Sequence, residues 1–302
     1  MRHRAAVTTL GAGLVLACAP QPAVIAPARA ATTDWPSYGG GVLGERHSPL
    51  TDIDTQSVRR LALVWTYHTG ELGPESRTRN KRSLEVTPIV VDGTMYIITP
   101  LARIIALDPA TGRERWVYDA RLDRGLGFGD HTSRGVSTWL DGSRPEGAPC
   151  RRRILAATVD ARLLALDAAT GRPCDDFGDR GVVDLRAGLR NAPFETAEYE
   201  ETSPPLVVND LIVVGSAVAD NNRIDAASGE VRAFDVRTGA RRWTWDPVPQ
   251  DSTDPAFATW RGARAHHTGA ANAWSVLAAD PARDLVFVPT GSASVDYYGG
   301  ER

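Results

Sequence analysis

The chain has 302 residues, of which 42% are hydrophobic and 24% are charged, and its formal net charge is -3. This balance excludes a disordered chain, and the mild acidity gives no reason to expect a nucleic-acid partner. Its 28 glycines and 20 prolines exceed the share of about 12% found in average proteins, which favours many short elements over a few long helices.

Residues 1–30 have the pattern of an export signal peptide. Arg2 and Arg4 supply a positive start, residues 5–17 an apolar stretch, and residues 28–30 (Ala-Arg-Ala) a small-x-small cleavage site. No later stretch contains the roughly 18 uninterrupted apolar residues that a transmembrane helix needs. We therefore expect residues 31–302 to be exported to the periplasm or elsewhere in the cell envelope.

A second cleavage is also compatible with this leader. Residues 15–18 (Val-Leu-Ala-Cys) resemble a lipobox, in which Cys18 would be acylated and would become the mature N-terminus. The sequence leaves both cleavages open, and the second would add a lipid anchor.

An early apolar segment, residues 63–67, is predicted to be an isolated outer strand carrying Trp65. The next predicted hairpin pairs residues 86–91 with residues 94–99 around Asp92-Gly93, a dipeptide typical of tight turns. Later hairpins are predicted around Asn209-Asp210 and around Asp280-Pro281, the latter joining residues 274–279 to residues 285–290.

A short string recurs after these hairpins. It reads Ala-Leu-Asp-x-x-Thr-Gly or a close variant, at residues 106–112, 165–171 and 233–239, and the first and third copies are followed by Trp116 and Trp243. In each copy the Asp side chain is expected to cap the turn, and Gly supplies a positive φ before the chain returns as a strand. A tryptophan on the outer strand, next to such a Gly, is expected to pack between neighbouring units.

Four strands per repeat predict an all-β fold, a β-propeller of four-stranded antiparallel blades. About three and a half such blades fit into the chain. We therefore expect the 302 residues to form the first part of a longer ring.

Two cysteines, Cys150 and Cys174, flank the strand pair predicted between them. Antiparallel pairing of these strands would bring the two cysteines close together, and an oxidising compartment favours a disulfide. Two free buried thiols are the alternative.

The repeats resemble the tryptophan-docking motif of the quinoprotein dehydrogenases, whose catalytic domain is an eight-bladed propeller carrying pyrroloquinoline quinone (PQQ) on its axis. Further strings resemble the membrane-type glucose and quinate dehydrogenase branch, which also has two cysteines at the places of Cys150 and Cys174. These strings are DWPSYG at 34–39, RHSPL at 46–50, EVTP at 85–88, HTSRGVS at 131–137, TSPP at 202–205 and DN at 220–221. The resemblance covers residues 31–302, as a partial PQQ-dependent propeller.

The resemblance implies a set of cofactor contacts. Glu85 would hydrogen-bond to the edge of the quinone, and His131 would replace the adjacent-cysteine disulfide that stacks on the cofactor in the alcohol dehydrogenases. Arg134 and Thr202 would bind cofactor carboxylates, and Trp274 would form the floor beneath the ring system.

The resemblance also implies a metal site and a reaction. Asp220 and Asn221 resemble the oxygen ligands of the Ca²⁺ or Mg²⁺ ion that bridges protein and quinone. The reaction is oxidation of a sugar or polyol hydroxyl, with electrons passed to a respiratory acceptor such as ubiquinone or a soluble carrier. The general-base aspartate of the family lies in a later blade, which is expected beyond Arg302. We therefore assign no catalytic residue and expect the isolated chain to be inactive.

One alternative belongs to a different functional class. Propellers with the same repeat also serve as non-enzymatic binding scaffolds in the cell envelope. A scaffold would have no reason to hold Glu85, His131, Arg134, Asp220 and Asn221 at the dehydrogenase spacing.

Overall fold

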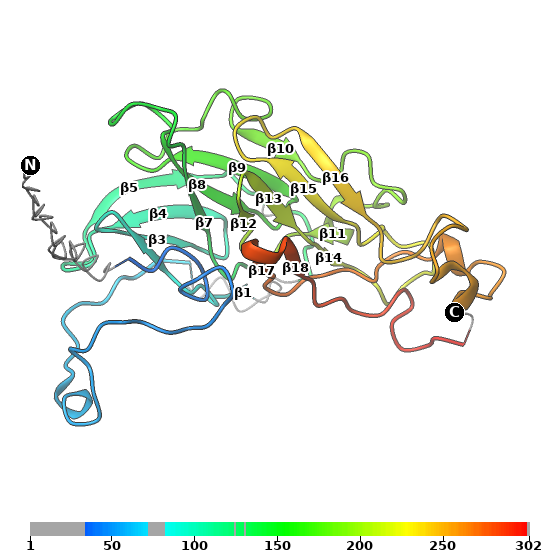
Figure 1. The fold of residues 1–302 in the computed structure, drawn as a ribbon, viewed down its shortest axis with the longest axis horizontal. Coiled ribbons are helices and arrows are strands. Elements are labelled where there is room, and N and C mark those ends of the chain that lie inside the picture. Colours follow the sequence, from blue (N-terminus) through cyan, green and yellow to red (C-terminus); the bar gives the residue numbers. More distant parts are fainter. Residues whose placement is uncertain (1–33, 72–81, 124, 130, 301–302) are drawn as a thin grey trace, which may run out of the picture. The chain divides into compact units, whose positions relative to one another are not determined.

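The computed structural model describes residues 34–71, 82–123, 125–129 and 131–300, and it consists mainly of short antiparallel strands (Figure 1). The predicted leader, residues 1–30 with Cys18, lies outside this range, and so does Arg302 at the other end of the chain. Within the described part of the chain, no helix has the length and the apolar character that crossing a membrane requires.

Three four-stranded sheets follow one another along the chain, and neighbouring strands in each are antiparallel. We call them blades 1, 2 and 3. Blade 1 contains β2 (Ile89–Val91), β3 (Thr94–Ile98), β4 (Arg103–Leu107) and β5 (Glu114–Asp119); blade 2 contains β7 (Ser137–Leu140), β8 (Arg152–Ala157), β9 (Arg162–Asp167) and β10 (Val182–Asp184); blade 3 contains β12 (Leu206–Val208), β13 (Leu211–Val214), β15 (Val231–Asp235) and β16 (Arg241–Trp245). The predicted four-stranded blades are confirmed.

A further hairpin follows blade 3, formed by β17 (Ala278–Asp280) and β18 (Leu285–Phe287). Both strands are shorter than predicted, since β17 begins at Ala278 and β18 ends at Phe287, and the 3₁₀ helix η6 (Pro281–Arg283) connects them. The other short elements connect the blades. They are β1 (Arg82–Ser83) paired with β6 (His131–Thr132), β11 (Tyr199–Glu200) paired with β14 (Ala217–Val218), and the 3₁₀ helices η1 (Val58–Arg60), η3 (Thr196–Glu198), η4 (Phe257–Thr259) and η5 (Ala265–His267).

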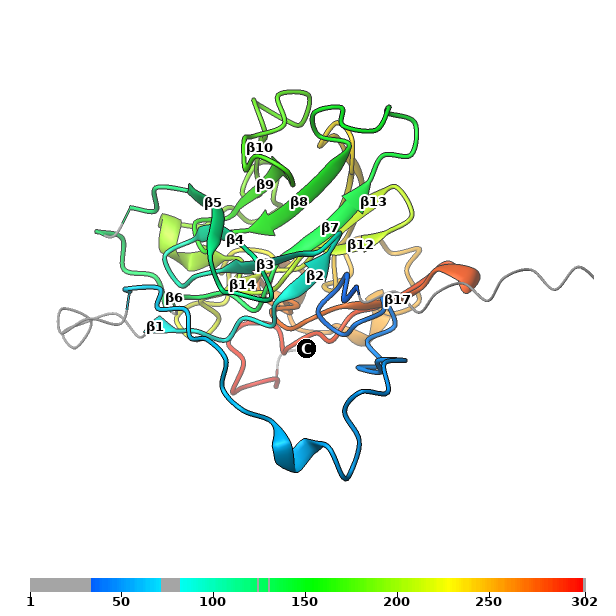
Figure 2. The same ribbon diagram turned by 90° about the vertical axis from the view of Figure 1, so that its left-hand side faces the viewer.

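The core lies between adjacent blades. Ile89 and Ile104 of blade 1 share one buried apolar cluster with Leu166 of blade 2. Leu155 of blade 2 shares another with Phe234 of blade 3. β12, the first strand of blade 3, contacts β7, the first strand of blade 2, and β17 of the following hairpin (Figure 2).

Each repeated turn has the geometry expected from its sequence. In the first copy, Asp108 Oδ1 accepts hydrogen bonds from the backbone N–H of Thr111 at 3.0 Å and from its hydroxyl at 2.9 Å. Asp167 and Asp235 make the same pair of contacts in the other copies. The closing glycines have φ values of 69°, 72° and 73°, a region that favours glycine (Gly112, Gly171 and Gly239).

Tryptophan docking is confirmed at two of these turns. Trp65 lies over Gly112 and Trp116 lies over Gly171, and in each case a β-carbon on the glycine would lie 2.6 Å from the indole. Each indole N–H also donates to the carbonyl of the residue after the turn aspartate. The distances are 3.1 Å from Trp65 Nε1 to Pro109 O and 2.9 Å from Trp116 Nε1 to Ala168 O.

The predicted strand at residues 63–67 is wrong, because this segment is not part of a sheet. Leu63 and Val64 are 84% and 83% exposed, so the segment is held by the docking of Trp65 and not by a backbone ladder. Trp65 docks on the Gly112 turn without forming the predicted strand.

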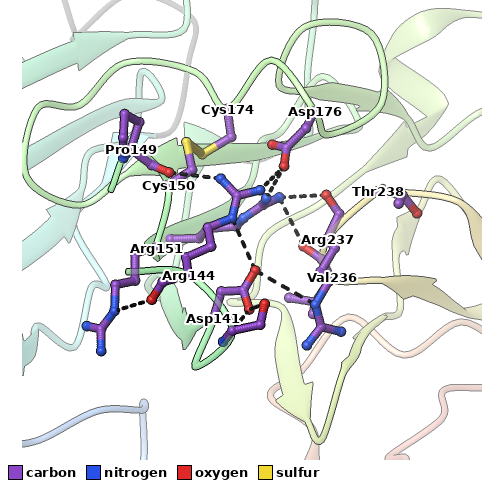
Figure 3. A network of polar contacts seen from close by, with 12 residues as sticks. Asp141, Arg144, Pro149, Cys150, Arg151, Cys174, Asp176, Val236, Arg237 and Thr238 are labelled. Atoms are coloured by element: carbon purple, nitrogen blue, oxygen red, sulfur yellow. Dashed lines mark hydrogen bonds and ion pairs between the residues drawn. A yellow bond between two sulfur atoms is a disulfide. The ribbon is translucent and has the colours of Figure 1, made fainter. Parts of the chain in front are cut away.

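At the junction between blades 2 and 3, an arginine donates to the turn carbonyl where an indole donates at the other two junctions. Arg153 of β8 is 0% exposed, and its Nη1 donates to the carbonyl oxygens of Val236 at 3.2 Å and Arg237 at 2.7 Å (Figure 3). Val236 directly follows the turn aspartate Asp235, so its carbonyl corresponds to the two that accept from tryptophan elsewhere. Arg153 Nη2 also pairs with Asp176 Oδ2 at 2.7 Å.

The predicted disulfide is confirmed. Cys150 and Cys174 are bonded with their Cα atoms 5.8 Å apart, and the bond lies beside the Arg153 junction (Figure 3). Asp176, which pairs with Arg153 and Arg144, follows Cys174 by two residues. A crosslink closing a loop of this length is expected to contribute roughly 3 kcal/mol, and here it also anchors the carboxylate that faces the buried guanidinium.

Replacement of Gly171 by alanine tests the docking. Gly171→Ala combines the strain of a positive φ with a clash against Trp116, and overpacking of this kind typically costs about 1–3 kcal/mol. Gly93→Ala is the matched control, because Gly93 has a φ of 66° and open space around its Cα. Denaturant unfolding should show a larger loss of the free energy of unfolding for Gly171→Ala; equal losses would contradict the docking account.

Replacement of Arg153 by leucine tests the arginine junction. The variant leaves two buried carbonyl oxygens without their donor, which is expected to lower the free energy of unfolding by about 1–3 kcal/mol. Arg180→Leu is the control, since Arg180 also faces an aspartate but its side chain is 85% exposed. If the two variants unfolded at the same denaturant concentration, Arg153 would not have the structural role assigned to it.

Candidate functional site

Four of the residues predicted to bind the cofactor lie just before the first strand of consecutive units. Glu85 precedes β2, Arg134 precedes β7, Thr202 precedes β12, and Trp274 precedes β17. Because these strands are neighbours in sequence order, the four residues gather at one end of them. Their placement follows from the repeat itself and does not depend on a long functional loop.

Backbone and side-chain hydrogen bonds join the four segments in sequence order. Thr87 N donates to Arg134 O at 3.0 Å, and Arg134 N donates to Thr202 O at 2.9 Å. The hydroxyl of Ser203 donates to Trp274 O at 2.7 Å. At Gly135 a β-carbon would lie 3.2 Å from Thr87 O, so glycine permits this close approach of two blades.

Arg134 is the centre of this group. Its Nη2 lies 3.0 Å from the Glu85 carboxylate, and its Nη1 donates to the Thr202 hydroxyl at 2.9 Å. Its guanidinium carbon lies 5.2 Å from the centre of the Trp274 ring. The side chain is 19% exposed, so the structure holds a largely buried cation beside a hydroxyl and an aromatic face.

A cavity of about 290 Å³ opens beside Arg134. Its wall includes Arg134, Thr202, Trp274 and Asp220, which means that the structure brings together four of the seven predicted ligand residues. The other lining residues are Gly129, Thr132, Ala197, Glu200, Ala217, Val218, Ala219 and Asn272. Trp274 is 50% exposed, so its indole is available to a planar ligand.

Three predicted residues do not line this cavity. Glu85 reaches the site only through its ion pair with Arg134. Asn221 is exposed. His131 is 0% exposed, with its ring edge-on to Phe128 at a centroid distance of 5.6 Å, because its segment is held in β6. Their direct contacts with a cofactor or metal therefore stay predictions.

The general base was predicted to lie beyond Arg302, the last residue of the chain. Arg302 itself falls outside the described residues, so the structure does not test this prediction. We therefore assign no catalytic residue to the described site.

Asp220 lies in an electronegative part of the site. Partial burial raises the pKa of the Asp220 carboxyl above its ordinary value, and the nearby carboxylate of Asp296 adds to this effect. The Asp220 backbone is held by the hydroxyl of Ser294, which donates to its carbonyl oxygen at 2.7 Å. A carboxylate placed against another carboxylate is stabilised by a bound cation.

Sequence reasoning missed three polar residues of the cavity wall, Thr132, Glu200 and Asn272. Glu200 is 5% exposed, and its Oε1 accepts from Gly129 N at 2.6 Å. Asn272 is 2% exposed. It precedes Trp274 by two residues, but this spacing alone does not identify it as a residue of the cavity wall.

The comparisons with known proteins agree with this geometry. Residues 35–302 match the family model described as "Glucose/ethanol/alcohol dehydrogenase, beta-propeller domain", designated PQQ. The chain belongs to this PQQ β-propeller family. The relationship confirms the resemblance found in the repeats.

Three relatives are dehydrogenases of different substrates. The chain is 36% identical over 288 residues to the quinoprotein glucose dehydrogenase of Gluconobacter oxydans, covering 91% of this chain and 34% of that protein. It is 37% identical over 284 residues to the glycerol dehydrogenase large subunit of the same organism, covering 94% and 37%. It is 34% identical over 281 residues to the quinate/shikimate dehydrogenase (quinone) of Acinetobacter baylyi, covering 89% and 34%.

A solved structure shows the same fold. The quinohemoprotein alcohol dehydrogenase from Comamonas testosteroni matches with a TM-score of 0.68 and 28% identity, covering 88% of this chain and 36% of that chain. The chain therefore spans about a third of the length of the curated relatives it matches.

The polar groups in the cavity fit PQQ, a flat molecule with several carboxylates. Arg134 offers a charged donor for a carboxylate, and the hydroxyl of Thr202, which accepts from Arg134 and donates to Trp274 O, lies beside it. The exposed face of Trp274 offers a stacking surface. Asp220 adds the oxygen that a divalent ion would need.

A buried carboxyl behind the site gives a pH-dependent prediction. Glu201 is 3% exposed, and burial raises its pKa well above the ordinary value, with Arg232 partly opposing the shift. In the pH range between the ordinary and the raised pKa, only the folded state keeps this proton, so the stability falls as the pH rises through that range.

We expect Glu201→Gln to remove this loss. The variant should melt at a higher temperature than the parent at neutral pH, and the difference should vanish below the ordinary glutamate pKa of about 4.3. Thermal melting over a pH series measures it, with the exposed Glu195→Gln as the control. A difference that stayed constant over the whole series would refute the assignment.

Proposed function

We propose that the full-length protein is a PQQ-dependent dehydrogenase that oxidises a hydroxyl group of a sugar or polyol. The observation that carries this proposal is the arrangement of Arg134, Thr202 and Trp274 around one cavity, together with Asp220. These are residues that the family resemblance assigned to the cofactor and the metal, and they come from separate units of the fold.

The residues of this chain would bind and orient the cofactor. Arg134 and Thr202 would hold a carboxylate at the cavity wall, and the Trp274 indole would support the flat face of the ring system. Glu85 fixes the direction of the Arg134 guanidinium through their 3.0 Å ion pair. Asp220 would bind the Ca²⁺ or Mg²⁺ ion. Bound PQQ would supply the two-electron oxidant, since the cofactor carries such chemistry.

The substrate class follows from the relatives. Their names specify glucose, glycerol and quinate or shikimate, so we infer a small polyhydroxylated substrate without choosing among them. We place the reaction in the periplasm or cell envelope because of the predicted leader. The name of the quinate/shikimate relative includes quinone, which supports a respiratory quinone as acceptor, with a soluble carrier as the other option.

The test is a titration of the full-length, metal-free protein with PQQ and CaCl₂, followed by the absorbance of the cofactor. Arg134→Ala should weaken PQQ binding by about 10- to 100-fold, the effect of losing roughly 1.5–3 kcal/mol of charge-assisted hydrogen bonding. Arg134→Lys should recover only part of this, because lysine lacks the planar fork.

The exposed variant Arg180→Ala is the control and should bind PQQ like the parent. Oxidation of glucose, glycerol and quinate with an artificial electron acceptor then identifies the substrate. If the parent protein bound no PQQ, or if Arg134→Ala bound it unchanged, the non-enzymatic envelope scaffold would be the better interpretation.

A further inference from the structure

The side-chain amide of Asn272 has one anchored end and one end without a partner. Its Nδ2 donates to Ser216 O at 2.7 Å. Because a carbonyl oxygen only accepts, this contact identifies the nitrogen end of the amide and leaves Oδ1 on the opposite side. Oδ1 is buried and has no hydrogen-bond partner within the described part of the chain.

The unpartnered oxygen belongs to a residue of the cavity wall. Asn272 is 2% exposed and lines the cavity together with Asp220, Arg134, Thr202 and Trp274. Buried acceptors are nearly always satisfied in folded proteins, and a bound ion is one explanation for an exception beside a cavity. The backbone of Asn272 is held as well, since its carbonyl accepts from Gly291 N at 2.9 Å.

The surroundings favour a cation over a hydrogen-bond donor as that ligand. Asn272 O accepts from Gly291 N, and the same returning segment contains Ser294, whose hydroxyl donates to Asp220 O. If the neutral Oδ1 of Asn272 were the only acceptor there, a hydroxyl or an N–H group would be a suitable ligand. Asp220, with the carboxylate of Asp296 nearby, adds negative charge, and amide and carboxylate oxygens together suit a hard divalent ion.

We propose that Asn272 Oδ1 is an oxygen ligand of a divalent cation, Ca²⁺ or Mg²⁺, held in this cavity with Asp220. The proposal rests on the proposed function, because the same ion is the one expected beside PQQ. It changes the predicted ligand set: Asn221 is exposed and does not line the cavity, so the amide at 272 takes the position that the sequence assigned to the amide at 221.

Isothermal titration with CaCl₂ and then MgCl₂, on the full-length protein freed of metal and saturated with PQQ, tests the proposal. Asn272→Ala should raise the Ca²⁺ dissociation constant by at least about tenfold, the loss that even outer-shell partners of a metal typically cause. Asn221→Ala should leave it unchanged. Asn191→Ala is the matched control, since Asn191 Nδ2 also donates to backbone carbonyls, outside the cavity.

Asn272→Asp separates a ligand from a purely structural amide. This variant loses the donor to Ser216 just as alanine does, but it keeps an oxygen for the cation. A ligand role predicts that Asn272→Asp retains Ca²⁺ binding; a structural role predicts that it loses binding as alanine does. If Asn272→Ala does not fold, this second variant decides the question alone, and a tenfold weaker Ca²⁺ affinity for it would overturn the proposal.

The outcomes separate this inference from the proposed function. If the parent binds PQQ and Ca²⁺ and Asn272→Ala binds Ca²⁺ equally well, the ligand assignment is wrong and the proposed function stands. If the parent binds neither, both are wrong. Loss of Ca²⁺ binding in Asn272→Ala, with unchanged binding in Asn221→Ala and Asn191→Ala, supports the assignment.

Discussion

The fold depends on one repeated turn, whose backbone carbonyl accepts a hydrogen bond from the preceding unit of the chain. An aspartate caps the turn, a glycine with positive φ closes it, and the carbonyl after the aspartate is left to accept a hydrogen bond from outside. Two junctions satisfy that carbonyl with an indole N–H and one with the guanidinium of Arg153. The donor changes between junctions, but the acceptor and its place in the turn do not.

This constraint determines where the site forms. Each blade contacts the next through such a turn, and the segments just before β2, β7, β12 and β17 are hydrogen-bonded to one another in chain order. Arg134 then joins Glu85, Thr202 and Trp274 through an ion pair, a hydrogen bond and a cation–π contact. The cavity is thus a consequence of the repeat, since each unit contributes a few polar residues at the same position.

The sequence was sufficient for much of this. The turns, the blades and the disulfide follow from local patterns, because turn chemistry and strand alternation act over a few residues. Four of the cavity residues were predicted from the family resemblance. The remainder depends on contacts between segments far apart in sequence. No local pattern shows that Arg153 replaces an indole, that His131 is buried against Phe128, or that Asn272 rather than Asn221 faces the cavity.

Another cavity, of about 490 Å³, lies beside β7 and β12, the first strands of blades 2 and 3. Its lining includes Tyr38, Trp139 and Leu206. A crystal structure of the full-length protein with PQQ and Ca²⁺ is therefore the most direct measurement. The account predicts density for PQQ against the Trp274 indole, with a carboxylate on Arg134. Density in the larger cavity, or a PQQ molecule without contact to Arg134, would contradict it.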